Sequence, residues 1–261
     1  MLAPLTLLTL AASLATASAK KVWDGRANRQ TSSAFLSKWS WSNQVGPYQY
    51  YIHGSGAVSN YVNLDAAYKN PADAGSKRGF QITIDETAKW AGQSMYRTEL
   101  IPQTKNKINE GLVYYHFSVQ HTSKNAPNAA DEHQVAFFES HFTEMKFGGS
   151  LGNKLAWYAN GQSQWSVDFK ADVWHNIVYA IDFAKGSVTF YHSTGGNKLV
   201  KTAGPVSVSA SSNGQDWHLG VLKLPGSGAA KREDWRFSGV YIEKGALTTS
   251  VSGPGGAKAR K

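Results

Sequence analysis

Short runs in which hydrophobic and polar residues alternate recur along most of the chain. Each run is rich in aromatic or β-branched residues and is bounded by Gly, Pro, Asn or Asp, a pattern typical of β-strands. No segment keeps a helical period for long enough to predict a substantial helix. Strands are predicted at 48–53, 58–64, 80–85, 95–101, 112–120, 133–139, 143–147, 155–159, 164–168, 174–183, 187–192, 217–224 and 235–243.

Many short strands with turn signals between them predict an all-β fold, either a sandwich or a barrel. The strands are too numerous for a small barrel, and Gly148-Gly149, Gly161 and Gly195-Gly196 mark hairpins or bends. We therefore expect a β-jelly-roll sandwich with a concave substrate groove. A single catalytic domain is predicted over 20–249, because the sequence shows no internal repeat and no second pattern.

The two ends of the chain differ from this body. Residues 1–19 contain no charged side chain, include an apolar run and end in Ala17-Ser18-Ala19, which is typical of a secretory signal peptide with its cleavage site. The apolar run is shorter than the about 20 residues that a membrane-spanning helix needs. We therefore expect a secreted, extracellular protein. Residues 250–261 are rich in Gly, Ala and Lys and predict a disordered tail.

Composition and charge narrow the classes of function. The chain has no cysteine, so its stability must come from a packed core, and a cysteine-ligated metal site is excluded. The net charge is +9, but the basic residues are dispersed apart from the C-terminal end, so no nucleic-acid or membrane partner is predicted. The sequence has neither a Gly-rich phosphate loop nor a G-x-S-x-G motif, which disfavours nucleotide chemistry and a serine hydrolase. We expect a monomer that uses no metal and no cofactor.

The run 95–101 carries two charges where a packed strand would carry none. Because side chains alternate between the faces of a strand, Arg97 and Glu99 point to one side, and their neighbours Tyr96, Thr98 and Leu100 point to the other. Burying an ionised carboxylate costs free energy unless it is paired, so the two charges indicate a lined groove. An ordinary ion pair at a sheet edge or on the surface is the alternative interpretation.

Other predicted strands also place titratable residues at their centres. His116 lies on the polar face of 112–120, His133 and Glu139 share one face of 133–139, and His218 lies opposite Trp217. If these strands are neighbours, two carboxylates meet in an aromatic-rich groove, an arrangement that suits glycoside hydrolysis. The histidines and Arg97 would then tune the acids or hold sugar hydroxyls. The other histidines are interpreted as structural: His53, His121, His141, His175 and His192.

Three segments of the chain resemble a known family. YRTELIPQT (96–104), HQVAFFESHFTEMKFG (133–148) and DWHLGVLKLP (216–225) are similar to segments of glycoside hydrolase family 131, fungal secreted β-glucanases with a β-jelly-roll fold. The resemblance implies hydrolysis of β-1,3, β-1,6 and β-1,4 linkages in β-glucan by an inverting mechanism, with Glu99 and Glu139 as the catalytic pair. An inverting pair should lie about 6.5 to 9.5 Å apart, because a water must fit beside the sugar. The matching motifs also imply substrate-binding roles for Arg97, His133, Gln134 and His218.

Two alternative functions stay open. A polysaccharide lyase on the same fold would act on a polyuronate such as glucuronan or alginate, because R-x-E-L also resembles a motif of jelly-roll lyases and the positive charge would attract an acidic polymer. A lectin would bind glucan without cleaving it. Products that absorb ultraviolet light would indicate the lyase, and binding without release of reducing sugar would indicate the lectin.

Overall fold

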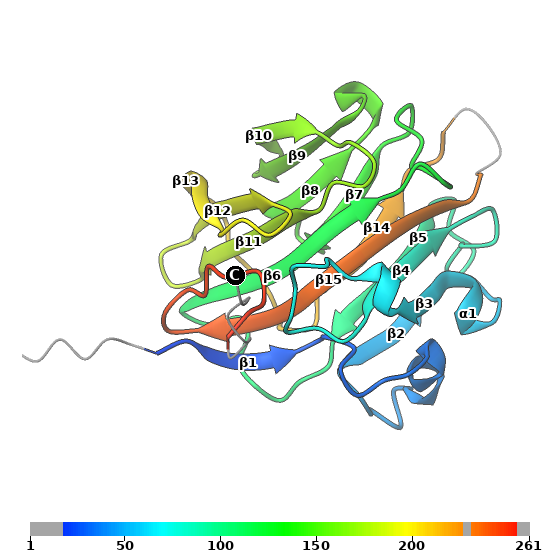
Figure 1. The fold of residues 1–261 in the computed structure, drawn as a ribbon, viewed down its shortest axis with the longest axis horizontal. Helices are drawn as coiled ribbons and strands as arrows, with labels where there is room; N and C mark the ends of the chain where they lie inside the picture. Colours follow the sequence, from blue (N-terminus) through cyan, green and yellow to red (C-terminus); the bar gives the residue numbers. More distant parts are fainter. Residues whose placement is uncertain (1–17, 227–230, 255–261) are drawn as a thin grey trace, which may run out of the picture.

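The protein folds as two antiparallel β-sheets that face one another across a hydrophobic core (Figure 1). The structure is a computed structural model, and it describes residues 18–226 and 231–254. The all-β sandwich predicted from the alternating runs is confirmed. Helical segments are short: η1 (Ser33–Lys38), α1 (Val58–Tyr61), η2 (Ala66–Tyr68) and η3 (Gly149–Leu151).

The larger sheet has eight strands. Its order is β13-β12-β11-β6-β15-β4-β3, and β1 pairs with β15 beside this path. The strands are β1 (Lys20–Asp24), β3 (Val62–Asp65), β4 (Gly79–Ile84), β6 (Leu112–His121), β11 (His175–Asp182), β12 (Ser187–Thr194), β13 (Val200–Ser207) and β15 (Glu233–Lys244).

The second sheet has seven strands in the order β10-β9-β8-β7-β14-β5-β2. They are β2 (Tyr48–Ile52), β5 (Tyr96–Pro102), β7 (His133–Phe138), β8 (Thr143–Phe147), β9 (Lys154–Ala159), β10 (Gln162–Asp168) and β14 (Trp217–Lys223). Strand β14 therefore lies between the two strands that carry the charged motifs, β5 and β7.

The interior is built from alternate residues of facing strands. Tyr115 and Phe117 of β6 point inward, and Trp217 of β14 meets the Tyr115 ring edge-on at a centroid distance of 5.1 Å. Burial of one large apolar side chain contributes roughly 1.5–3 kcal/mol. A continuous layer of such residues stabilises a chain that has no cysteine.

Three local predictions differ from the structure. The first half of the predicted strand 58–64 is the helix α1, because Tyr61 turns inward to place its hydroxyl 2.9 Å from the Thr87 hydroxyl. Strands β1 and β13 lie in regions where the sequence predicted none. Two lysines begin β1, and β13 contains Gly204 and Pro205, so neither segment carries the usual strand pattern.

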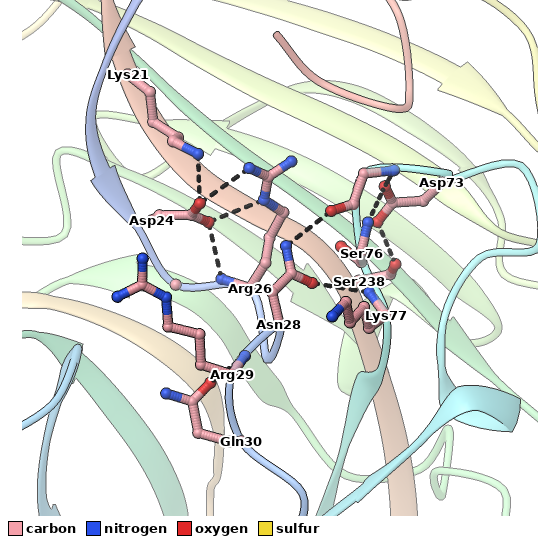
Figure 2. A network of polar contacts seen from close by, with 12 residues as sticks. Lys21, Asp24, Arg26, Asn28, Arg29, Gln30, Asp73, Ser76, Lys77 and Ser238 are labelled. Carbon is pink, nitrogen blue, oxygen red and sulfur yellow. Dashed lines mark hydrogen bonds and ion pairs between the residues drawn. The ribbon is translucent and has the colours of Figure 1, made fainter. Parts of the chain in front are cut away.

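The segment that follows β1 is fixed to the sandwich by both apolar and polar contacts. Trp23 packs edge-on against Tyr48 at 5.1 Å, as expected of an anchor. Figure 2 shows the polar side: the buried Arg26 donates to both oxygens of Asp24, at 2.8 and 2.9 Å. The Asn28 side chain donates to Gly75 O at 2.8 Å and so ties this segment to the loop before β4.

The ends of the described chain extend the folded body on both sides. Strand β1 starts at Lys20, the first residue after the expected cleavage site. The Ser252 hydroxyl accepts from Ala74 N at 3.2 Å and donates to Ala72 O at 3.1 Å, so the body continues beyond residue 249. Residues 1–17 of the expected signal peptide and 255–261 of the expected tail lie outside the described residues. Within the described ranges, no helix is long and apolar enough to cross a membrane.

Candidate active site

Arg97 and Glu99 lie on the face of β5 that points away from the other sheet. Thr98, between them, donates its hydroxyl to Thr83 O of β4 at 2.9 Å, and Leu100 belongs to the core, so the inward face of β5 is defined. Strand alternation then places Arg97 and Glu99 outward. Both are nevertheless buried, with Glu99 at 0% exposure.

The two charged side chains form a two-point ion pair. Arg97 Nε donates to Glu99 Oε1 at 2.7 Å, and Nη2 donates to Oε2 at 2.9 Å. Burial by itself would lower the pKa of Arg97, but the hydrogen bonds and charge of Glu99 outweigh it and raise the pKa. Arg97 Nη1 also donates to Gln93 Oε1 at 3.2 Å. The pair is thus a fixed, buried feature and not a surface ion pair.

His218 of β14 links Glu99 to Glu139. Its Nδ1 lies 2.5 Å from Glu99 Oε2, and its Nε2 lies 3.2 Å from Glu139 Oε2. The imidazole is stacked on Phe137 with a centroid distance of 4.8 Å, which fixes the plane of the ring. Because both ring nitrogens face carboxylate oxygens, a proton can pass from one carboxyl to the other through the imidazole. We call Glu99, His218 and Glu139 the carboxyl–imidazole line.

The two carboxyl groups of this line have opposite surroundings. The Glu99 side chain is fully buried, whereas 66% of the Glu139 side chain is exposed. Glu139 follows β7 directly, and its backbone N–H donates to Asp216 O at 3.0 Å. Glu139 is therefore the carboxyl that a molecule from solvent can reach.

An irregularity in the pairing of β7 with β14 decides which residues of β7 share a face with Glu139. The register shifts between His218 and Val221 of β14, so two residues of β14 lie opposite Ala136 alone, and Ala136 has a φ of 46°. Val135 and Phe138 consequently both belong to the core, while Phe137 stacks on His218 outside it. Strand alternation correctly predicts that Phe137 lies on the same face as Glu139. It gives the wrong face for the residues that precede this irregularity.

His133, which precedes this irregularity, points into the sandwich instead of towards Glu139. It is fully buried, and its Nε2 lies 2.7 Å from Glu233 Oε2 of β15. The expectation that His133 shares a face with Glu139 is therefore wrong. Gln134, next to it, is half-buried and lies on the same face of the sheet as Arg97 and Glu99, since His133 and Val135 on either side point inward.

His116 is on the polar face of its strand, as predicted, but that strand belongs to the other sheet. Its Nε2 lies 3.0 Å from Glu243 Oε1 of β15, and its ring stacks on Tyr241 at 4.1 Å. Burial lowers the pKa of His116, against the effect of Glu243. The structure does not bring His116 to the carboxyl–imidazole line.

His141, which was expected to be a structural histidine, lies close to the line. Its ring stacks on the ring of Phe137 at a centroid distance of 5.4 Å, and the His218 ring stacks on the same phenyl ring. The Nδ1 of His141 lies 3.0 Å from Glu144 Oε2. The hydrogen bond to Glu144 raises the pKa of His141, and the charge of Glu139 adds to the effect. The position of His141, two residues after Glu139, is the sequence signal that could have identified it.

Aromatic side chains flank the line on the β2 side. Tyr51 of β2 contacts the rings of Trp39, Trp41 and Trp90 at centroid distances of 5.6, 5.0 and 5.9 Å. Burial raises the pKa of Tyr51, and the charges of Glu139 and Glu99 raise it further. In the part of the chain that the structure describes, no group of three or more His, Asp or Glu side chains is arranged to hold a metal ion.

The fold and the site together define a β-sandwich domain with a buried carboxyl–imidazole cluster on one sheet. Residues 22–248 match the family described as glycoside hydrolase 131 catalytic N-terminal domain. The chain belongs to glycoside hydrolase family 131. The family and the fold expected from the three sequence segments are thereby confirmed.

Two solved structures support this assignment. A GH131 β-glucanase catalytic domain from Podospora anserina has 60% sequence identity and a TM-score of 0.88, over 90% of this chain and 100% of that one. The catalytic domain of the glycoside hydrolase family 131 protein from Coprinopsis cinerea has 49% identity and a TM-score of 0.87, over 92% of this chain and 100% of that one. A comparison with curated protein sequences gave no match.

Proposed function

We propose that the protein is a secreted β-glucanase that hydrolyses β-1,3, β-1,6 and β-1,4 linkages with inversion, using Glu99 and Glu139 as its acid–base pair. The carboxyl–imidazole line is the observation that carries the proposal, because it joins an exposed carboxyl to a buried one beside an aromatic surface. The substrate class is supported by the relative from Podospora anserina, which is described as a β-glucanase. Secretion is supported by the leader-like residues 1–19.

The contrast between the two carboxyl groups suggests how they divide the work. Glu139 exchanges a proton directly with the sugar or with the attacking water, because its carboxyl is exposed. Glu99 exchanges its proton through His218, because its oxygens face only Arg97 and His218 among the described residues. In the balanced cycle, Glu139 takes a proton from the attacking water, while His218 Nε2–H gives one to the leaving oxygen and regains it from Glu99. The imidazole then carries the proton on Glu139 back to Glu99, which restores the starting state.

The separation of the two carboxyl groups is compatible with inversion, but His218 fills the space between them, so the resemblance to the family and not this distance carries the inverting mechanism. One imidazole between contacts of 2.5 and 3.2 Å separates the two facing oxygens by about 7 to 8 Å. Inverting pairs are typically about 6.5 to 9.5 Å apart, whereas retaining pairs are about 5 Å apart. Inversion at a β-linkage releases the α-anomer as the first product.

The test combines product analysis with substitution of each carboxyl. We expect reducing sugar from laminarin, a β-1,6-glucan and barley glucan, with the α-anomer visible first by proton NMR. Glu139→Gln and Glu99→Gln should each lower kcat by about 10² to 10⁴. The control is Glu110→Gln, since Glu110 is exposed and pairs with the exposed Lys107.

Several outcomes would contradict parts of the proposal. Unsaturated, ultraviolet-absorbing products from glucuronan or alginate, without reducing sugar from glucans, would indicate a lyase. Binding of glucan without any release of sugar would indicate a lectin. The β-anomer as first product would overturn inversion, and full activity in Glu139→Gln would overturn its catalytic role.

A further inference from the structure

Trp41 presents an exposed indole beside the candidate active site. Trp41 is 61% exposed, and the other large hydrophobic residues that are exposed in the described part of the chain are aliphatic. Its ring centroid lies 5.0 Å from the ring of Trp39 and 5.0 Å from that of Tyr51. We call Trp39, Trp41 and Tyr51 the aromatic platform.

The platform is held in place by polar contacts of the loop that carries it. Trp39 is buried, and its Nε1 donates to Gln103 Oε1 at 3.1 Å. Ser40 and Asn43 form a β-bridge across Trp41, and the Asn43 side chain donates to Lys38 O at 2.9 Å. The exposed indole therefore sits on a fixed loop, so little conformational entropy is lost when a ligand covers it.

The platform lies one strand away from Glu99. Tyr51 precedes Ile52, and Ile52 is the Cα partner of Glu99 in the pairing of β2 with β5. The charges of Glu139, Glu99 and Arg97 all act on the Tyr51 hydroxyl, as expected of a ring that faces the carboxyl–imidazole line. An aromatic surface on the β2 side thus lies next to the carboxyl–imidazole line, in the direction perpendicular to the strands.

We propose that the aromatic platform binds glucosyl units of the substrate chain that extend from the cleaved bond over the β2 side of the site, with Trp41 as the main contact. A β-glucosyl ring carries its hydroxyls equatorially and so offers a flat C–H face to an indole. An axial hydroxyl, as in a galactosyl ring, puts a polar group against one face, and burying that group unpaired costs free energy. A gluco-configured ring can therefore stack either face on the platform, whereas a galactosyl ring can stack only one. This inference rests on the proposed function, because it assumes that the cleaved chain passes Glu139.

Steady-state kinetics on substrates of two lengths test the platform. For a linear β-gluco-oligosaccharide of about six units, Trp41→Ala should raise KM about tenfold and leave kcat within about twofold, as expected for one lost aromatic contact. A short chromogenic β-glucoside that does not reach Trp41 should show no change. Trp41→Phe keeps an aromatic face and should recover most of the affinity.

Tryptophan fluorescence gives a readout that does not need turnover. Titration of the wild-type protein with the long oligosaccharide should change its emission, and Trp41→Ala should lose most of that change. The control is Trp165→Phe, because Trp165 of β10 is also partly exposed but packs near His192 at 4.5 Å, on a different strand pair. A galacto-oligosaccharide of the same length should give a much smaller change.

The two proposals fail in distinguishable ways. If the protein hydrolyses β-glucan and Trp41→Ala has the wild-type KM for the long substrate, the platform proposal is overturned and the function stands. If no β-glucan is hydrolysed but the oligosaccharide still changes Trp41 fluorescence, the function is overturned and the binding site stands. Equal loss of affinity for the long and short substrates would indicate disturbance of the site and contradict the platform.

Discussion

At the scale of single residues, Glu99 depends on Arg97 more than on any other neighbour. The guanidinium supplies two of the three contacts to a carboxylate that has no exposure to solvent. A buried ion pair adds little net stability compared with an apolar pair, but loss of one partner leaves the other charge uncompensated. The prediction for Arg97 follows from this asymmetry.

Replacing Arg97 should destabilise the protein to a degree set by how much of the ion pair the new side chain preserves. Arg97→Met should lower the free energy of unfolding by about 3–5 kcal/mol, because Glu99 stays buried without its cation. Arg97→Lys keeps the charge but not the planar two-point geometry, so its effect should lie between Met and wild type. Urea unfolding measures both. Lys107→Met, in an exposed pair, should change the free energy by less than about 1 kcal/mol, and an equal loss there would contradict the argument.

Sequence alternation identified the central residues of the site but not their whole surroundings. It placed Arg97 with Glu99 and put His218 opposite Trp217, and the structure brings these three polar side chains together. It failed for His116, because alternation gives the face of a strand and does not say to which sheet the strand belongs. It failed for His133 because an irregularity in strand pairing interrupts the alternation of faces, and the sequence does not show where this occurs.

At the scale of elements, the contact between β5 and β14 sets the position of the carboxyl–imidazole line. Gly220 of β14 is the Cα partner of Glu99 and has a φ of 152°. A Cβ built on Gly220 would lie 2.2 Å from Thr98 O and 2.8 Å from Glu99 Cα, both on the backbone of β5. The two strands therefore approach closely only because this position has no side chain.

A methyl group at Gly220 should separate β5 from β14. Gly220→Ala should lower kcat/KM at least about tenfold, because the 2.5 Å contact between Glu99 and His218 lengthens, and should cost on the order of 3 kcal/mol of stability. Gly161→Ala is the control, since Gly161 also has a positive φ of 70° but no atom lies within 4 Å of its added Cβ. If both variants lose activity equally, backbone strain and not strand separation is the cause.

Among the elements, the strands with dense aromatic and β-branched alternation were predicted within a few residues of their observed bounds, such as β8 over Thr143–Phe147. Of the two missed strands, β1 contributes only Val22 and Trp23 to the core, and β13 has residues that do not pack. In β13, the side chains are exposed or half-exposed along its length, so hydrogen bonding to β12 and not a buried face holds it in the sheet. Such a strand leaves no period in the sequence.

At the scale of the whole molecule, a buried ionic network joins the two sheets through the core. Lys223 of β14 lies 2.6 Å from Glu233 of β15 and 2.8 Å from Asp131. His133 of β7 lies 2.7 Å from the other oxygen of Glu233. Although burial opposes ionisation of Glu233, His133 and Lys223 outweigh it and lower the pKa of this carboxyl.

Loss of Lys223 should destabilise the protein in a pH-dependent way. Because the folded-state pKa of Glu233 is below 4.5, its contribution is present above pH 4.5 and is lost as the pH falls through the folded value. Lys223→Met should therefore cost about 3–5 kcal/mol near neutral pH, and the deficit should shrink as the pH falls below 4.5 through the folded value. Urea unfolding of both proteins across this range measures the difference. A deficit that does not change with pH would contradict the role of Glu233.

The order of the strands in the two sheets has a consequence for synthesis. In the larger sheet, β15 lies between β6 and β4 and pairs with both. In the smaller sheet, β14 lies between β7 and β5 and pairs with both. Both strands follow the strands that they join, so a growing polypeptide leaves edges of β5 and β7 unpaired until β14 is made, and edges of β1, β4 and β6 unpaired until β15 is made. Since His218 also lies on β14, Glu99 and Glu139 are linked only once β14 is made. A chain that stops before β14 therefore cannot carry the carboxyl–imidazole line, and the pairing of β14 both joins the smaller sheet and assembles the site.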